Sequence, residues 1–257
     1  MSARRSSRSL TAALALLLAG CAGLPAPSPA PLPPEVHRLL DAMDRRWQQF
    51  EDLRTRAEIT VHRGRQVERL SGVLLLKSPD SLRLEALSPW GQPFLVITAG
   101  GGSFTLYHVG ENRALVGPAS ARATERWLGF ALEPRELVAI LFGHVLPMKA
   151  PLTGALRPAG GSGLALELQG PREVQRIWID AETLVVRQVE WTGEDRQLRV
   201  TYEGGGPAEP PAIVTLSAPE PALVVSIRYW NPEVGVGLQA ERFTLTLPDH
   251  AKIQRFR

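Results

Sequence analysis

Short runs of alternating apolar and polar residues, separated by turn-forming residues, fill most of this chain and restrict it to a sheet-rich fold. Residues 57–61 (Ala-Glu-Ile-Thr-Val) and 82–86 (Leu-Arg-Leu-Glu-Ala) show the pattern within residues 55–116, and strands with one buried face alternate in this way. Glycine, proline and asparagine fall between the runs, where hairpin loops need them. Residues 152–257 continue the pattern, with a last predicted strand at 243–247. Together these runs predict about ten or eleven antiparallel strands.

Two of the predicted strands are apolar on both faces. Residues 73–76 read Val-Leu-Leu-Leu and residues 94–97 read Phe-Leu-Val-Ile. A strand with one solvated face would alternate, so something apolar must cover or occupy the second face. Two short apolar helices, predicted at 124–132 and 134–142, are candidates for this cover. The expected fold class is therefore α+β and mainly β, a curved antiparallel half-barrel with an N-terminal helix and a short helical lid.

The N-terminal element of the predicted domain is an amphipathic helix. Apolar residues recur at helical spacing over residues 36–50 and include Met43 and Trp47, while charged residues occupy the other side. Pro34 suits the first turn of such a helix. The tryptophan and methionine stripe could contact a ligand or belong to the core, and stripes of this kind are more often core.

Ahead of this domain the chain has the features of a lipoprotein leader. Three arginines precede an apolar run, Leu10–Leu18, that is too short to cross a bilayer. Residues 18–21 (Leu-Ala-Gly-Cys) then resemble the lipobox of bacterial lipoproteins, which is cut before a cysteine that receives acyl chains such as palmitate; Cys21 is the only cysteine. The alternative is an ordinary secretory signal peptide followed by an unmodified thiol at Cys21. The lipobox predicts a signal peptide at 1–20, a lipidated Cys21 with its tether at 21–34, and a lipid-binding domain at 35–257.

The tether and the charge balance limit the possible partners. Six prolines between residues 22 and 34 favour an extended spacer. The formal net charge of the whole chain is +3, and the three leader arginines account for it. A nearly neutral mature chain gives no reason to expect nucleic acid binding. Without a second cysteine, the mature chain has no internal disulfide.

The sequence contains no recognisable catalytic motif. The five histidines fall in five different segments, which predicts no metal site. There is no Gly-x-Ser-x-Gly elbow, phosphate loop or dinucleotide-binding fingerprint. Glu133 and Glu136 could act as acid and base, but at a predicted helix start the helix dipole explains them better. We therefore expect a protein that is not an enzyme and uses no cofactor; a catalytic pair assembled from distant segments remains an alternative.

A curved sheet with short apolar helices beside it can enclose one of two kinds of interior. The first is a concave pocket with a lid, which suits acyl chains, and the second is a dry core. The residues expected to line such a pocket or its lid are Trp47, Leu74, Leu76, Leu84, Trp127, Phe130, Leu137 and Leu141. The sequence leaves the two interiors open.

Several segments together resemble the bacterial LolA and LolB proteins. These segments are residues 70–72 (Leu-Ser-Gly), 87–92 (Leu-Ser-Pro-Trp-Gly-Gln), 132–137 (Leu-Glu-Pro-Arg-Glu-Leu) with Gly143, 177–180 (Ile-Trp-Ile-Asp) and 243–248. The similarity covers roughly residues 35–250. LolA is a periplasmic lipoprotein carrier and LolB is its outer-membrane lipoprotein receptor, so the resemblance implies a half-barrel that binds acyl chains.

With its lipobox-like sequence, the chain is more similar to LolB than to the soluble LolA. The resemblance implies a monomeric, lipid-anchored chaperone on the periplasmic face of the outer membrane. Residue 22, directly after the cysteine, is alanine and not aspartate, which by the sorting rule of enteric bacteria also implies the outer membrane. It would receive lipoprotein acyl chains or phospholipid, with a LolA-like carrier as donor, and deliver them through a membrane-insertion loop at Pro89, Trp90 and Gly91. The alternative for Trp90 is a turn residue folded onto the rim. The alternative function is an envelope lipoprotein that binds a protein partner in a structural or regulatory role.

Overall fold

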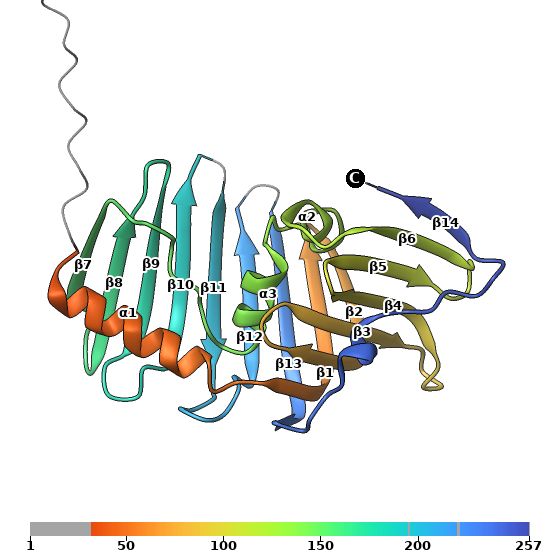
Figure 1. The fold of residues 1–257 in the computed structure, drawn as a ribbon, viewed down its shortest axis with the longest axis horizontal. Coiled ribbons are helices and arrows are strands. Elements are labelled where there is room, and N and C mark those ends of the chain that lie inside the picture. Colours follow the sequence, from red (N-terminus) through yellow and green to blue (C-terminus); the bar gives the residue numbers. More distant parts are fainter. Residues whose placement is uncertain (1–31, 195, 220–221, 257) are drawn as a thin grey trace, which may run out of the picture. The chain divides into compact units, whose positions relative to one another are not determined.

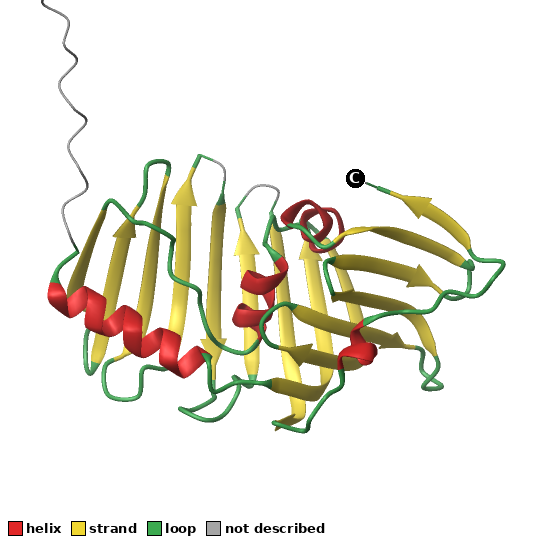
Figure 2. Ribbon diagram, viewed as in Figure 1, coloured by secondary structure: helices red, strands yellow, loops and turns green. Residues whose placement is uncertain are grey.

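The computed structural model describes residues 32–194, 196–219 and 222–256. The predicted leader, Cys21 and most of the tether lie outside these residues. The described chain forms one open, curved sheet of 14 strands, with helices packed along it (Figure 1, Figure 2). This confirms the mainly β half-barrel, although the strands outnumber the prediction of about ten or eleven.

The elements alternate between long runs of strands and short groups of helices. The helices are α1 (Pro34–Trp47), α2 (Ala121–Leu128) and α3 (Pro134–Leu141), with a 3-10 helix η1 (Ala240–Phe243) near the C-terminus. The strands before α2 are β1 (Asp52–Arg63), β2 (Gln66–Lys77), β3 (Ser81–Leu87), β4 (Pro93–Gly100), β5 (Ser103–His108) and β6 (Arg113–Pro118). Those after α3 are β7 (Thr153–Pro158), β8 (Gly163–Gln169), β9 (Glu173–Asp180), β10 (Val186–Gly193), β11 (Gln197–Glu203), β12 (Ile213–Ala218), β13 (Leu223–Val234) and β14 (Lys252–Arg255).

The strand order makes a single sheet from both halves of the chain. It runs β14-β6-β5-β4-β3-β2-β1-β13-β12-β11-β10-β9-β8-β7. β14 runs parallel to β6, while the pairs along the rest of the sheet are antiparallel. β1 joins β13 in the middle, with Ala57 opposite Tyr229 and Ile59 opposite Ile227. Residues far apart in sequence therefore share one inner face of the sheet.

Local signals fix where the helices begin and end. α1 starts with Pro34 in its first turn, as predicted. α2 starts after Ser120, whose Oγ accepts a hydrogen bond from the Ala123 N–H at 3.4 Å, and it ends at Gly129 with φ of 86°. The predicted range 124–132 was therefore too late, because the cap at Ser120 and the left-handed glycine were not used to set it.

The inner face of the sheet and the helices share one apolar core. α1 buries Val36, Leu39, Met43 and Trp47 in it, so the tryptophan and methionine stripe belongs to the core. Residues 137–141 of α3 are all buried as well. Burial of this kind stabilises the helices more than their own propensity does, since helices of eight residues are marginal in isolation.

Two buried tyrosines tie the end of α3 to the sheet. The Tyr229 hydroxyl on β13 donates to the Leu141 carbonyl at 2.7 Å, and the Tyr202 hydroxyl on β11 donates to the His144 carbonyl at 3.2 Å. Burial raises the pKa of both phenols, so both remain neutral donors over the physiological range. The C-terminal end of α3 is thus fixed at two points.

We expect Tyr229→Phe to lower the free energy of unfolding by about 1–2 kcal/mol, because a buried carbonyl loses its hydroxyl partner while the ring is kept. Urea denaturation measures this loss. Tyr107→Phe is the matched control, because its hydroxyl bonds the Asn112 side chain at 2.9 Å in a less buried place. Equal losses in the two variants would contradict the proposed role of Tyr229.

The outer face of β4 is covered by the C-terminal segment and not by the predicted lid helices. Phe243 is 2% exposed and lies over Gly100, where an added Cβ would be 2.9 Å from the Phe243 Cβ. Arg83 Nη1 on β3 donates to the Arg242 carbonyl at 3.0 Å, which holds the segment in place. The predicted strand at 243–247 was wrong: η1 occupies its start and the rest forms no strand.

Candidate functional site

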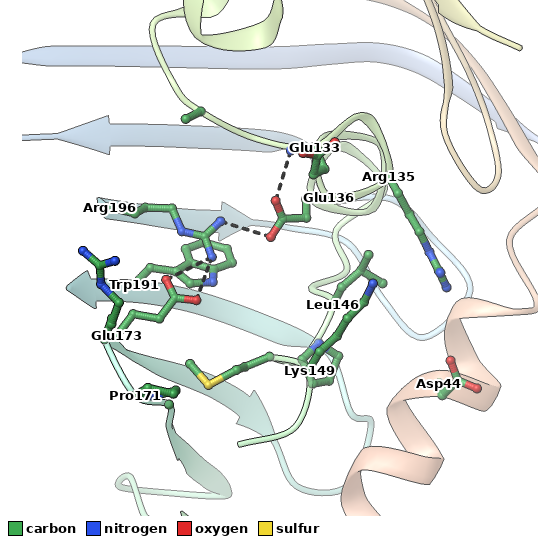
Figure 3. Close-up of a pocket in the computed structure, with 15 residues that line it drawn as sticks. Asp44, Glu133, Arg135, Glu136, Leu146, Lys149, Pro171, Glu173, Trp191 and Arg196 are labelled. Atoms are coloured by element: carbon green, nitrogen blue, oxygen red, sulfur yellow. Dashed lines mark hydrogen bonds and ion pairs between the residues drawn. The ribbon is translucent and has the colours of Figure 1, made fainter. Parts of the chain in front are cut away.

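A groove of about 780 Å³ lies between α1 and α3 on the helix-bearing side of the sheet (Figure 3). Five segments form it: α1, the start of α3 with the residues just before it, the loop that follows α3, the β8–β9 turn, and the β10–β11 end of the sheet. The lining residues are Asp44, Ala131, Glu133, Arg135, Glu136, Leu146, Pro147, Met148, Lys149, Gly170, Pro171, Arg172, Glu173, Trp191 and Arg196. Its volume is within the range of about 300–1,000 Å³ typical of ligand pockets.

The apolar side of the groove depends on a buried glutamine. Gln175, on the inner face of β9, is fully buried. Its Oε1 accepts from the Met148 N–H at 2.7 Å and its Nε2 donates to the Leu146 carbonyl at 3.0 Å. Gly170 leaves room for Met148, because an added Cβ would lie 2.8 Å from the Met148 Sδ. The loop therefore presents Leu146 and Met148 to the groove in a fixed position, beside Trp191.

A part-buried charge cluster forms one wall. Arg196 Nη1 bonds Glu136 Oε1 at 3.0 Å, and its Nη2 lies 3.3 Å from Glu173 Oε2. The guanidinium carbon lies 4.7 Å from the centre of the Trp191 ring, a cation–π arrangement (Figure 3). Glu136 Oε2 also accepts from the Glu133 N–H at 3.1 Å. These partners place Glu136 in a helix-start and wall-building role, which favours the helix-start interpretation over an acid and base pair.

We expect Arg196→Gln to destabilise the fold by about 1 kcal/mol, since it leaves Glu136 and Glu173 without their shared cation. It should also change the near-ultraviolet circular dichroism of Trp191. Arg199→Gln is the control, because Arg199 pairs with Glu190 at 2.6 Å in a more exposed place. An Arg196 variant as stable as the Arg199 variant would contradict the proposed wall.

Two cations at the groove have no ion-pair partner among the residues described. Arg135 on α3 and Lys149 on the loop both extend into the space between α3 and α1 (Figure 3). Asp44 of α1, on the far side, accepts from its own neighbour Gln48 at 2.7 Å. The groove therefore combines an apolar floor with two cations, Arg135 and Lys149, and with the carboxylates of Asp44 and Glu133 at its edges. An apolar floor bordered by charged groups suits an amphiphile with a charged end.

The predicted pocket residues lie elsewhere. Trp47, Leu74, Leu76, Leu84, Phe130 and Leu141 are buried in the core, and none of them lines the groove. Trp127 and Leu137 border a space of about 10 Å³ beneath α2, which is too small for an acyl chain. In this conformation the interior under the helices is filled, and the open space lies beside α3. The sequence did not predict the groove residues because they come from five separate segments.

The loop between β3 and β4 is a tight turn that projects Trp90. The Gly91 N–H donates to the Ser88 carbonyl at 2.8 Å, and Gly91 has φ of 79°, a conformation that favours glycine. Trp90 is 86% exposed, so its side chain is not folded against the rim. Pro89 and Gly91 are exposed beside it.

The described residues offer neither a metal site nor a membrane-spanning helix. Residues 32–194, 196–219 and 222–256 contain no group of three or more histidine, cysteine or acidic side chains placed to hold a metal. Over the same residues, no helix has the length and apolar character that crossing a membrane requires.

Comparison with solved structures identifies the fold. A DUF1329 family protein from Desulfovibrio piger superposes with a TM-score of 0.57 at 14% identity, covering 82% of this chain and 96% of that one. A putative outer membrane lipoprotein-sorting protein domain from Vibrio parahaemolyticus gives 0.56 at 13%, covering 81% and 94%. A LolA superfamily protein from Nitrosomonas europaea gives 0.53 at 12%, covering 82% and 97%.

The chain shares the fold of these three proteins, one of which is a LolA superfamily protein. This confirms the resemblance drawn from the sequence at the level of fold. No family model matches the chain, and no curated protein matches it. Within this LolA/LolB-like fold, the groove beside α3 and the exposed Trp90 loop are the features that carry the functional argument.

Proposed function

We propose that this protein is a non-enzymatic envelope protein that binds acyl chains in the groove beside α3 and passes them to the membrane. The observation that carries the proposal is the groove itself, in which Leu146, Met148 and Trp191 offer an apolar surface and Arg135 and Lys149 offer unpaired cations. Apolar burial contributes about 25 cal/mol per Å². An acyl chain therefore transfers from a donor protein to this groove when it buries more apolar surface area in the groove than in the donor.

In the same proposal, the interior that is filled in this structure is a second and deeper binding site for the acyl chain. Trp47, Leu84, Phe130 and the other predicted pocket residues would form a larger apolar cavity if α2 and α3 moved away from the sheet. α2 is the more easily displaced of the two, because α3 is tied by Tyr202 and Tyr229. The groove would then be the first contact for an acyl chain and the core the deeper one.

The proposed location follows from the N-terminal sequence. Acylation of Cys21, with palmitate among the chains, would anchor the protein to the periplasmic face of the outer membrane, with a LolA-like carrier as the donor. Two or three acyl chains hold a protein on a bilayer nearly permanently, at about 0.8 kcal/mol for each buried methylene. The likeness to a lipoprotein-sorting domain supports an envelope role.

Binding can be tested with a fluorescent fatty acid and a leader-free form of the protein that begins at Ala22, lacks Cys21 and therefore carries no acyl chains. The proposal predicts saturable binding that an acylated lipoprotein peptide displaces and its unacylated form does not. Equal displacement by the two peptides would contradict acyl recognition.

Delivery is expected to depend on Trp90. A charged residue at this exposed tip opposes entry into the bilayer, so Trp90→Glu should slow transfer of an acylated cargo to vesicles about tenfold while leaving cargo binding unchanged. A transfer assay with labelled cargo measures both steps. Val109→Glu, an exposed residue in the β5–β6 turn, is the control, and unchanged delivery by the Trp90 variant would remove Trp90 from the mechanism.

Binding of a protein partner is the second candidate function. The filled interior favours it, as do the two edge strands of the sheet, β14 and β7, each of which has one unpaired side among the described strands. Crosslinking in cells separates the candidates: a protein partner in specific crosslinks together with no extractable lipid would favour this second function.

A further inference from the structure

We infer that the outer face of β13, β1, β2 and β3 carries a second membrane contact, distinct from the Trp90 tip, which takes the headgroup layer of an anionic phospholipid bilayer. It consists of a groove of about 840 Å³ lined by Arg56, Arg69, Leu87, Phe94, Trp230 and residues 88, 89 and 91 of the Trp90 loop, among others. The inference rests on the proposed delivery of acyl chains to a membrane, and it adds how the domain would be oriented there.

Trp230 points outward at one end of this groove, because inward and outward residues alternate along β13 and Tyr229 before it is buried. A β-bulge follows Trp230: the register between β1 and β13 shifts between Arg54 and Arg56, and Asn231 has φ of 51°. Thr55 Oγ1 donates to the Trp230 carbonyl at 3.1 Å, which holds the bulge. Trp230 is 53% exposed, although most tryptophans are largely buried.

The strand register places Trp230 and the Trp90 loop at opposite sides of one groove. Arg56 on β1 lies opposite Trp230 on β13, and Ser71 on β2 lies opposite both Glu58 and Leu87. Leu87 ends β3, directly before the loop. Because neighbouring strands are about 4.8 Å apart, the two sides are separated by roughly 14 Å. Two exposed tryptophans therefore flank the same surface.

The charge of this surface matches anionic lipid. Neither Arg56 nor Arg69 has an ion pair within the described part of the chain, and the groove lining sets these two arginines against one carboxylate, Glu58. The segment Asp52–Lys77, which forms β1 and β2, carries five arginines and one lysine against three acidic residues. One of these acids, Asp52, is buried. Positive charge and tryptophan together are the features that proteins present at the membrane interface.

A bilayer explains this combination better than a protein partner does. The groove is continuous with the Trp90 loop, the part of the chain proposed to enter the membrane, so one surface would contact headgroups while the tip reaches the acyl region. Tryptophan suits this depth because it is apolar in body and has one donor at its edge. The acyl-binding groove is built from other residues, so the two sites can be changed independently.

Sedimentation with vesicles tests the inference, using the mature chain without acyl chains and vesicles of phosphatidylethanolamine with 30% phosphatidylglycerol, roughly a bacterial proportion of anionic lipid. We expect Arg56→Gln/Arg69→Gln to lower the partition coefficient about tenfold and Trp230→Ala about fivefold. Arg157→Gln/Arg255→Gln, which removes two exposed arginines from the edge strands β7 and β14, is the matched control and should change it less than twofold.

Three outcomes would overturn the inference. They are equal partition of the groove and control variants, equal partition of the unchanged protein into phosphatidylcholine vesicles, and loss of a protein crosslink in the groove variants while vesicle binding persists. Fluorescent fatty acid binding, measured on the same variants, should be unchanged. If the unchanged protein does not bind the fatty acid, that result counts against the proposed function, while the vesicle measurements still decide whether this groove contacts a membrane.

Discussion

Lowering the pH from 7 to 4 is expected to cost the fold about 3 kcal/mol through His144 alone. This side chain is buried at the end of α3, with its ring centre 5.5 Å from that of Trp47 and 4.5 Å from that of Phe50. Burial, with a smaller contribution from the nearby Arg46, lowers the pKa of His144 to about 3. The folded protein therefore keeps this imidazole neutral at pH 4.

The sign follows from proton binding. The unfolded chain binds a proton at His144 near pH 6.5, whereas the folded chain does so only near pH 3. Between these values the unfolded state holds more protons, so the free energy of unfolding falls as the pH falls. Urea denaturation at pH 7 and pH 4 measures the change.

Variants isolate the histidine from other titrating groups. His144→Phe and His144→Gln do not titrate in this range, so each should lose about 3 kcal/mol less than the unchanged protein between pH 7 and pH 4. Both variants are measured, so that poor packing of one replacement side chain does not determine the result. The same pH slope in all three proteins would mean that His144 is accessible to protons in the folded state.

The second large effect is expected in the acyl-binding groove. Met148→Glu places a carboxylate on the apolar floor, and an acyl chain would then have to bury or displace that charge. We expect affinity for a fluorescent fatty acid to fall at least tenfold, which corresponds to about 1.4 kcal/mol. The Met148 main chain keeps its bond to Gln175, so the loop should stay in place.

Leu152→Glu is the control for this variant. Leu152 is 41% exposed, lies four residues further along the same loop, and does not line the groove. It should bind the fatty acid as the unchanged protein does. If the two variants bind equally well, the acyl chain does not contact Met148 and the site must be placed elsewhere.

Alternation along the chain was sufficient to predict most of the sheet. It was wrong at the edges of the sheet, where pairing with a neighbouring strand, and not the periodicity of the sequence, determines whether a segment forms a strand. β7 contains Gly154 and Pro158, which are tolerated because it is an edge strand. The alternating run at 243–247 forms no strand, because Phe243 packs over Gly100 on the outer face and β14 takes the free side of β6.

The candidate site was much harder to predict than the fold. Its loop, residues 142–152, has no periodic pattern, and its wall joins Glu136 to Arg196 across 60 positions. Only pairing of the strands brings these segments together. One signal was present in the sequence: Gln175 occupies an inward position on β9, where the next inward residues are Ile177 and Ile179, and a buried amide of this kind needs partners.

The central claim is that this fold carries acyl chains. Extraction of the mature protein, purified from its host, into organic solvent followed by mass spectrometry tests it most directly. The account predicts lipid or acylated peptide at close to one per protein in the unchanged chain and little in Met148→Glu. Protein that yields no lipid in repeated preparations, with the groove intact, would contradict it.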